Sequence, residues 1–381
     1  MATAPQHIGT RIAARRQARR MSQTDLSRVS GVSLSMIRGI ERGVRSPGAA
    51  TLDRLATALG TDPDRLLTAD PPRVSERVRA ALPRMSAAIA GYDIGTDKAT
   101  ATRALPELAT AVSAAETRRL GAQYSGLAAD VPRLLTDLLV TVHTVRMDRQ
   151  RAVRLLARAA RSADAVAYKA GAHDVSARLI DVMRWASEQA EDPLLAASAA
   201  YVRTEVFFAA RSYGLGLRAL EAAIDDCGPP VDAPNAAALG ALHMRAAVVA
   251  GRSGDADAAE THLTEARAMA LRVPEGIYSG TAFGPGSLRI HEVSVAVALD
   301  GDHTARVVEI AHGWKPPVGM TSERRSGFYI EVARAQVRSG RRADAFASLQ
   351  VARSIAPQHT RAHPWAREDT ATLRRLARGE R

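Results

Sequence analysis

Four side chains between positions 34 and 42 have the types and spacing needed to contact a nucleic acid. An arginine guanidinium presents a fork of N–H donors, so it can bind the edge of a base or neutralise a phosphate. If residues 33–42 form a helix, positions 34, 35, 38 and 42 lie on one face of it. The residues on this face are Leu34, Ser35, Arg38 and Arg42. The spacing therefore predicts an exposed helix face that could enter a major groove.

Two short helices and a tight turn are predicted to position this face. Ser22 is a suitable N-cap for the first helix, Asp25 can complete a capping box, and Ser33 can cap the second helix. Gly31 lies in the turn between them, where a positive φ costs glycine little. We expect the inner faces of the two helices to share a core made of Leu26, Val29, Val32, Ile37 and Ile40.

These residues resemble the DNA-binding domains of phage repressor and Cro proteins, a helix-turn-helix family widespread in bacterial regulators. The resemblance covers about the first 70 residues. It includes Ser22-Gln23, Gly31-Val32-Ser33, Ile40-Glu41-Arg42-Gly43, Pro47, and a further helix and turn that end at Leu67. It implies a five-helix domain over residues 1–67, in which Arg16 and Glu41 form a structural ion pair.

The same resemblance implies the residues that contact DNA. The base contacts would be Leu34, Ser35 and Arg38, and the phosphate contacts Arg20, Ser22, Gln23, Arg42 and Arg45. For Arg45, a solvated loop charge is an equally good interpretation. Two positions depart from the family: Arg20 replaces a helix-ending glycine, and Gly39 replaces a longer polar side chain that often contacts DNA. The first adds a candidate phosphate contact, and the second removes a candidate reader.

Positive charge is concentrated in this segment. The chain of 381 residues has a net charge of +12, and residues 1–45 contain nine arginines but only two acidic residues, Asp25 and Glu41. Such a local excess is the electrostatic footprint of a phosphate-binding module. The expected partner is double-stranded DNA, with a palindromic operator bound by a homodimer, because paired half-sites compensate for the few contacts of one head.

The sequence predicts a cytoplasmic, nucleoid-associated protein with no membrane partner. No basic stretch leads into an apolar run near the N-terminus, and the Ala/Val-rich segment 236–250 is interrupted by His243 and Arg245. The single cysteine, Cys227, excludes an intramolecular disulfide.

Catalytic and metal-binding motifs are not apparent. The ten histidines are scattered, and we find no phosphate-binding loop, no nucleophile elbow and no dinucleotide-binding glycine motif. We therefore expect no enzyme activity, no cofactor and no metal.

The rest of the chain is predicted to be all-α and repetitive. Pro71 and Pro72 place a linker at residues 68–73, before a second domain at 74–381. Ser253-Gly254, followed by Ala259, Leu263 and Ala266, recurs 86 residues later. Looser turns are expected at residues 169–171, 213–214 and 300–302. This pattern resembles the tetratricopeptide family, so the expected architecture is a TPR-like α-solenoid with a concave face.

Together the two halves resemble the helix-turn-helix regulators abundant in actinobacteria. Several C-terminal segments look like a pattern shared by that group, from Phe283-Gly284-Pro285 to Arg361-Ala362-His363-Pro364. The resemblance implies that the repeats dimerise and bind a peptide or small-molecule effector. Candidate groove residues are Trp185, Tyr201, Phe207, Phe208, Phe283 and His291. The alternative for the aromatic residues, which an Ala-rich chain favours, is to fill gaps between helix layers. A second interpretation of the whole chain is a protein-interaction scaffold with a DNA-tethering head.

Overall fold

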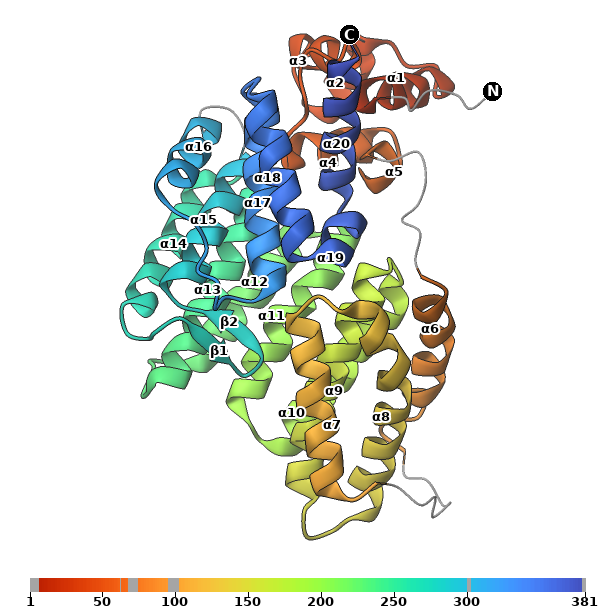
Figure 1. The fold of residues 1–381 in the computed structure, drawn as a ribbon, viewed down its shortest axis with the longest axis vertical. Coiled ribbons are helices and arrows are strands. Elements are labelled where there is room, and N and C mark those ends of the chain that lie inside the picture. Colours follow the sequence, from red (N-terminus) through yellow and green to blue (C-terminus); the bar gives the residue numbers. More distant parts are fainter. Residues whose placement is uncertain (1–6, 62, 68–74, 95–102, 300–302, 379–381) are drawn as a thin grey trace. The chain divides into compact units, whose positions relative to one another are not determined.

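The computed structural model describes residues 7–61, 63–67, 75–94, 103–299 and 303–378 (Figure 1). Within these ranges the chain forms twenty helices and one two-stranded hairpin. The expected fold class is therefore confirmed: a helical chain that begins with a helix-turn-helix domain. The predicted linker at 68–73 and the predicted turn at 300–302 lie outside the described residues.

The chain divides into two compact units. Unit 1 comprises Met1–Arg73, Ala250–Ala259 and Arg289–Arg381, and unit 2 comprises Val74–Val249 and Glu260–Leu288. The first and last parts of the sequence thus belong to the same unit, which the repeat pattern did not predict.

Five helices begin unit 1 and form the head: α1 (Ile8–Ala18), α2 (Gln23–Ser30), α3 (Leu34–Glu41), α4 (Ala49–Ala58) and α5 (Pro63–Leu67). The predicted start and stop signals are confirmed. Ser22 and Asp25 form a capping box on α2, Gly31 ends α2 with a φ of 65°, and the Ser33 side chain accepts a hydrogen bond from the backbone of Met36 in α3. Local sequence therefore determines the ends of both helices in the motif.

The core of the head differs from the prediction at one position. Leu26, Val32, Ile37 and Ile40 are buried as expected, but Val29 is 54% exposed. Ser30 is buried instead, and its hydroxyl donates to the backbone carbonyl of Leu26 at 2.6 Å. The inward face of α2 therefore runs through positions 26 and 30, four residues apart, and position 29 lies outside it.

Five helices form the C-terminal part of unit 1 in the described residues, and three of them share a core with the head. They are α16 (His303–Gly313), α17 (Ser322–Arg338), α18 (Arg342–Ile355), α19 (Pro357–Ala362) and α20 (Pro364–Ala377). Side chains of α17, α18 and α20, including Ile330, Leu349 and Leu373, share one apolar core with the helices of the head. Figure 1 shows α20 beside α4 and α5. The head is thus one part of a larger packed body.

Polar contacts reinforce this packing. Arg11 of α1 donates to the Glu368 carboxylate of α20 at 2.7 Å, and both side chains are mostly buried. Arg334 and Arg338 of α17 donate to the backbone carbonyl of Pro47 at 3.2 and 3.1 Å. These contacts join the start of the sequence to its end.

Unit 2 is a series of packed helices. Its elements are α6 (Glu76–Ala88), α7 (Leu105–Leu120), α8 (Tyr124–Thr144), α9 (Arg149–Lys169), α10 (His173–Ala190), α11 (Pro193–Ala210) and α12 (Tyr213–Cys227), together with parts of α13 (Ala233–Ser253), α14 (Ala256–Ala270) and α15 (Pro285–Leu299). Helix α9 packs against both of its sequence neighbours, α8 and α10. Small residues such as Ala159, Ala160 and Ala163 fill their contact, which allows helix axes to approach closely.

The predicted repeat corresponds to helical hairpins. Gly254 and Gly340 both lie in the bend between two helices, with φ values of 85° and 73°, and the expected apolar positions after each bend are buried. Gly171, with a φ of 75°, serves the α9–α10 bend in the same way. The bend predicted at Tyr213-Gly214 is wrong by two residues, because Arg211 takes the left-handed conformation and Tyr213 already begins α12.

The hairpin is the exception to the helical pattern. Strands β1 (Gly276–Tyr278) and β2 (Thr281–Phe283) pair antiparallel, with Tyr278 opposite Thr281. Ser279 and Gly280 form the two-residue tip with φ values of 45° and 76°, as a tight hairpin of right-handed twist requires. Phe283 anchors the base, since it is fully buried and occupies the space in which a side chain at Gly240 would lie.

Candidate nucleic-acid interface

The outer face of α3 carries the predicted reading residues. Ser35 and Arg38 are exposed and Leu34 is half-buried, whereas Ile37 and Ile40 are 0% exposed beneath them. A fully buried inner face fixes the rotation of the helix about its axis, so the outer side chains are presented in a defined direction. Arg42 follows at the C-cap, and its Nε donates to the carbonyl oxygen of Arg38 at 3.2 Å.

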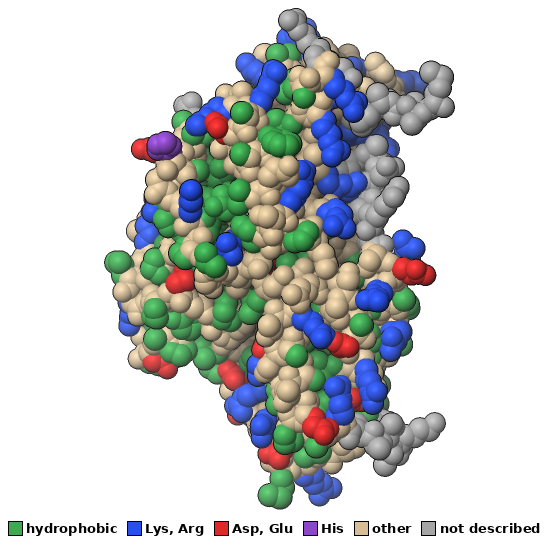
Figure 2. Space-filling view, in the orientation of Figure 1, with side chains coloured by type: hydrophobic (Ala, Val, Ile, Leu, Met, Phe, Trp, Pro, Cys, Tyr) green, Lys and Arg blue, Asp and Glu red, His purple; other side chains and the backbone are tan. Residues whose placement is uncertain are grey.

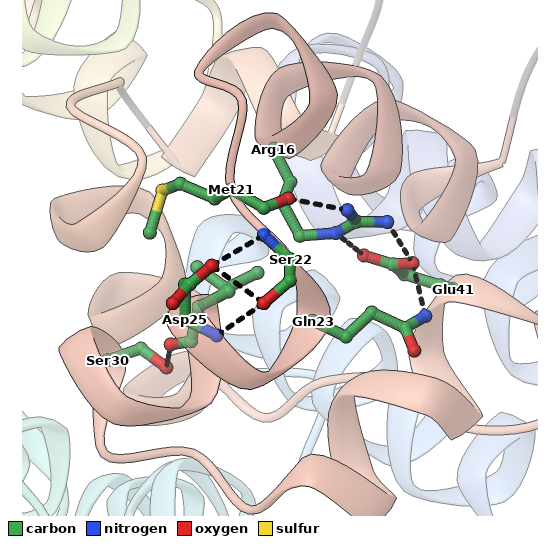
Figure 3. Close-up of polar contacts among 8 residues, drawn as sticks. Arg16, Met21, Ser22, Gln23, Asp25, Ser30 and Glu41 are labelled. Carbon is green, nitrogen blue, oxygen red and sulfur yellow. Dashed lines mark hydrogen bonds and ion pairs between the residues drawn. The ribbon is translucent and has the colours of Figure 1, made fainter.

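An ion-pair network joins the first three helices (Figure 3). Arg16 of α1 donates to both carboxylate oxygens of Glu41, at 2.7 and 2.9 Å, and to the carbonyl of Met21 at 2.8 Å. Gln23, at the start of α2, donates to the same carboxylate at 2.7 Å. Glu41 lies at the end of α3, so one carboxylate holds α1 and α2 against the candidate reading helix.

The network also sets the protonation state of Glu41. Burial alone would raise the pKa of this carboxyl, but hydrogen bonds from Arg16 and Gln23, together with the Arg16 charge, outweigh that effect and lower the pKa. Glu41 is therefore ionised throughout the neutral range.

Two of the expected phosphate contacts have partners within the head. The Ser22 hydroxyl donates to the Asp25 carboxylate at 2.6 Å and accepts from the Asp25 backbone N–H at 3.0 Å, and Gln23 donates its amide to Glu41. Hydrogen bonds that the Ser22 hydroxyl and the Ser22 backbone N–H donate to the Asp25 carboxylate lower the pKa of Asp25. The sequence predicted the capping contact between Ser22 and Asp25, but it did not predict the hydrogen bond from Gln23 to Glu41.

The other three expected phosphate contacts, Arg20, Arg42 and Arg45, are exposed. Arg20 has a φ of 55°, which explains why a helix-ending glycine suits this position. Gly39 is buried, and a Cβ there would lie 2.9 Å from Cδ of Arg45. Gly39 therefore makes room for the aliphatic part of the Arg45 side chain. From the sequence, Gly39 was interpreted only as the loss of a DNA-contacting side chain, and this packing was not expected.

Exposed positive charge covers much of the head. The exposed arginines of residues 7–48 are Arg15, Arg19, Arg20, Arg28, Arg38, Arg42 and Arg45. Elsewhere in unit 1, Figure 2 shows blue side chains gathered over α18 and α20 with few acidic ones among them. Unit 1 thus offers a surface suited to a polyanion.

The candidate groove residues do not form a single group. Tyr201 and Phe208 meet at the Arg245 guanidinium, at 5.0 and 4.7 Å from its central carbon, whereas Phe207 packs with Arg203. Trp185 contacts Tyr92 and His143, with ring centroids 5.6 and 6.0 Å away.

Phe283 and His291 also differ from the groove prediction. Phe283 is a core residue at the base of the hairpin, and His291 is buried beside Arg324 in unit 1. Several of these aromatic residues thus have the gap-filling role that the sequence left as the alternative.

The described ranges contain neither a metal-ion cluster nor a membrane-spanning helix. No group of three or more His, Cys, Asp or Glu residues there is arranged to hold a metal ion. No helix in the described part of the chain combines the length and apolar character needed to cross a bilayer.

Comparison with known proteins gives matches to the head. Residues 12–66 match the family model "Helix-turn-helix". An uncharacterized HTH-type transcriptional regulator, y4wC of Sinorhizobium fredii, is 39% identical over 57 residues, which cover 15% of this chain and 40% of the relative. The chain therefore spans less than half the length of that relative.

Among solved structures, the chain is similar to Bacillus thuringiensis PlcR, crystallised in complex with the peptide PapR7 and DNA. The match covers 69% of this chain and 93% of that chain at 15% identity, with a TM-score of 0.29. The family match is confined to residues 12–66, which lie within the five N-terminal helices.

Proposed function

We propose that this protein is a sequence-specific DNA-binding transcriptional regulator. The observation that carries the proposal is the exposed face of α3, with Arg38 held outward over the buried Ile37 and Ile40, in a segment that matches the helix-turn-helix family. Arg38 would contact a base edge in the major groove, with Leu34 and Ser35 beside it. Arg20, Arg42 and Arg45 would contact phosphates.

The proposed regulator acts as a homodimer on a palindromic operator. One head presents a single eight-residue reading helix, so two heads on half-sites about 34 Å apart, or a multiple of that distance, supply the remaining contacts. The head offers little area for both DNA and a partner subunit, so the helical repeats are the proposed dimer surface.

An effector bound by the helical region would change the spacing of the two heads in the dimer. The contacts of α17 and α20 with the head provide a route for this change within unit 1: Arg11 to Glu368, and Arg334 and Arg338 to the Pro47 carbonyl. A movement of either helix would strain these contacts and shift the head. The effector need only bind the two arrangements with different affinity.

The salt dependence of DNA binding tests the proposal. The full chain is titrated onto a fluorescent duplex at several KCl concentrations, and we expect log Kd to rise linearly with log[KCl]. Replacing Arg20 or Arg42 by Gln should reduce the slope by about one phosphate contact each. A chain that binds no duplex even at low salt would refute the proposal.

A further inference from the structure

Two arginines in unit 2 are buried side by side beneath the tip of the β-hairpin. Arg119 of α7 and Arg161 of α9 are 9% and 8% exposed. Arg119 Nη2 donates to the Gly280 carbonyl at 2.8 Å, and Arg161 Nη1 donates to the Ser279 carbonyl at 3.1 Å. A Cβ at Gly280 would lie 3.3 Å from Arg119 Nη2 and 3.5 Å from Arg161 Cδ. The tip thus lies over the two guanidinium groups, with Gly280 half-buried and Ser279 exposed.

A third donor converges on the same carbonyl oxygen. The Ser198 hydroxyl of α11 donates to the Ser279 carbonyl at 3.2 Å, and Arg161 also contacts Ser198. Donors from α7, α9 and α11 therefore aim at two neighbouring acceptor atoms. Such a set of convergent donors is what a protein uses to hold a carboxylate.

Buried charged groups of both signs surround this point. Burial, followed by the nearby Arg119 charge, lowers the pKa of Arg161 to about 9. Asp164 and Glu205 are the nearby acids, but burial and the Glu205 charge raise the pKa of Asp164, which also accepts from Ser176 at 2.6 Å. Burial of Asp164 therefore favours the neutral form of this carboxyl group.

The hairpin tip offers backbone carbonyl oxygens to the two guanidinium groups. Its carbonyl oxygens are neutral, and hydrogen bonds to a charged acceptor are about twice as strong as those to a neutral one. Ser279 also holds a φ of 45°, a conformation that non-glycine residues seldom adopt. The guanidinium groups are already desolvated, so a ligand that replaces the tip need lose only its own water.

From these contacts we infer that Arg119, Arg161 and Ser198 form a carboxylate-binding site, and that the hairpin tip occupies this site until a ligand displaces it. The inference rests on the proposed effector function and gives the effector a chemical class: a molecule with a free carboxylate next to an apolar group. The apolar group would lie toward Tyr201, whose ring lies 5.9 Å from the Arg161 guanidinium carbon and 5.0 Å from that of Arg245.

Matched pairs of probes test the inference on the full chain without DNA. N-acetyl-phenylalanine and N-acetyl-phenylalaninamide represent a peptide C-terminus with and without its charge, and benzoate and benzamide represent a small acid. Binding is measured by calorimetry, and exposure of the tip by amide hydrogen exchange in residues 276–283. We expect the acid of at least one pair to bind about 10- to 100-fold more tightly than its amide and to speed exchange at the tip.

Variants distinguish this site from general binding. Arg119→Gln and Arg161→Gln should abolish the preference for the acid, whereas Arg154→Gln, an exposed arginine of the same α9 helix, should leave it unchanged. Gly280→Ala should instead tighten binding several-fold, because the added methyl crowds Arg119 and loosens the tip. This opposite effect keeps the test decisive even if the Arg161 variant does not fold.

The outcomes separate as follows. Preference for N-acetyl-phenylalanine identifies a peptide terminus, preference for benzoate identifies a small acid, and either result supports the site. Equal affinity for acid and amide in both pairs, or tighter binding of inorganic phosphate than of either acid, would overturn the inference. Neither result would affect DNA binding by the head, which the salt titration measures separately.

Discussion

Arg38 is the residue on which sequence readout depends in the proposed complex. It is exposed on α3, and a guanidinium there can bind guanine through two hydrogen bonds. Arg38→Ala should weaken operator binding by about 1–3 kcal/mol and relax preference at one base position, as measured on a panel of single-base operator variants. Arg28→Ala, on the exposed side of α2, is the control. If Arg38→Ala weakens binding equally on all sequences, Arg38 contacts phosphate.

Glu41 stabilises the candidate reading helix, and this stabilisation depends on pH. Its carboxylate binds Arg16 and Gln23, so Glu41→Gln should lower the free energy of unfolding by about 1.5–3 kcal/mol at pH 7. Because the folded-state pKa lies below the ordinary value of 4.5, this stabilisation is complete above that value and is lost as the pH falls through the folded-state pKa.

Urea denaturation of wild type and Glu41→Gln at pH 7 and at pH 3 measures the effect. The difference between them should shrink at pH 3, while the exposed Glu309→Gln should change little at either pH. A difference that is the same at both pH values would show that Glu41 stabilises the head without its charge.

Individual residues of the head differ in how far their roles could be predicted from the sequence. Ser22, Asp25, Gly31 and Ser33 act through neighbours in the chain, so their roles followed from spacing alone. Gly39 depends on where the Arg45 side chain folds back, and a position in the sequence does not reveal that contact. The Gln23 hydrogen bond to Glu41 likewise depends on how three helices meet.

At the scale of elements, the glycine bends between paired helices are the clearest structural requirement. Gly340 joins α17 to α18 with a φ of 73°, and no atom lies near the space of an added Cβ. Gly340→Ala should therefore destabilise the fold by about 1–2 kcal/mol through backbone strain alone. Gly313 also has open space but no positive φ, which makes Gly313→Ala a matched control.

Thermal unfolding of the two variants checks this prediction. Only Gly340→Ala should lower the Tm. Equal Tm values would mean that the bend does not require a left-handed residue.

The hairpin β1–β2 shows where element prediction from sequence failed. Each strand has three residues, too few to give an alternating pattern. Its position depends on Phe283 packing at Gly240 and on the two arginines under the tip, all distant in sequence. The bends at Gly254 and Gly340, in contrast, were predictable because repetition of a motif reveals it without knowledge of the packing.

At the scale of the whole molecule, the head does not stand alone. Its apolar core continues into α17, α18 and α20, more than 250 residues later in the sequence. Amphipathic patterns in each helix predicted that these faces would be buried but not which partner would bury them. This packing links the candidate DNA-binding surface to the end of the chain that the proposed effector response would use.

The proposed homodimer can be checked by sedimentation of the full chain. At micromolar concentration we expect a particle of twice the chain mass, and the same mass for Arg38→Ala, because Arg38 lies on the DNA face. A monomer at this concentration, without DNA, would exclude dimerisation through the repeats.

Selection of bound sequences from a pool of random DNA duplexes tests the central claim most directly. The wild-type chain should enrich two related half-sites with centres about 34 Å apart, or a multiple of that distance. Arg38→Ala should lose the preference at one position in each half-site. A wild-type pool that stays random after repeated rounds would contradict the assignment of α3 as a reading helix.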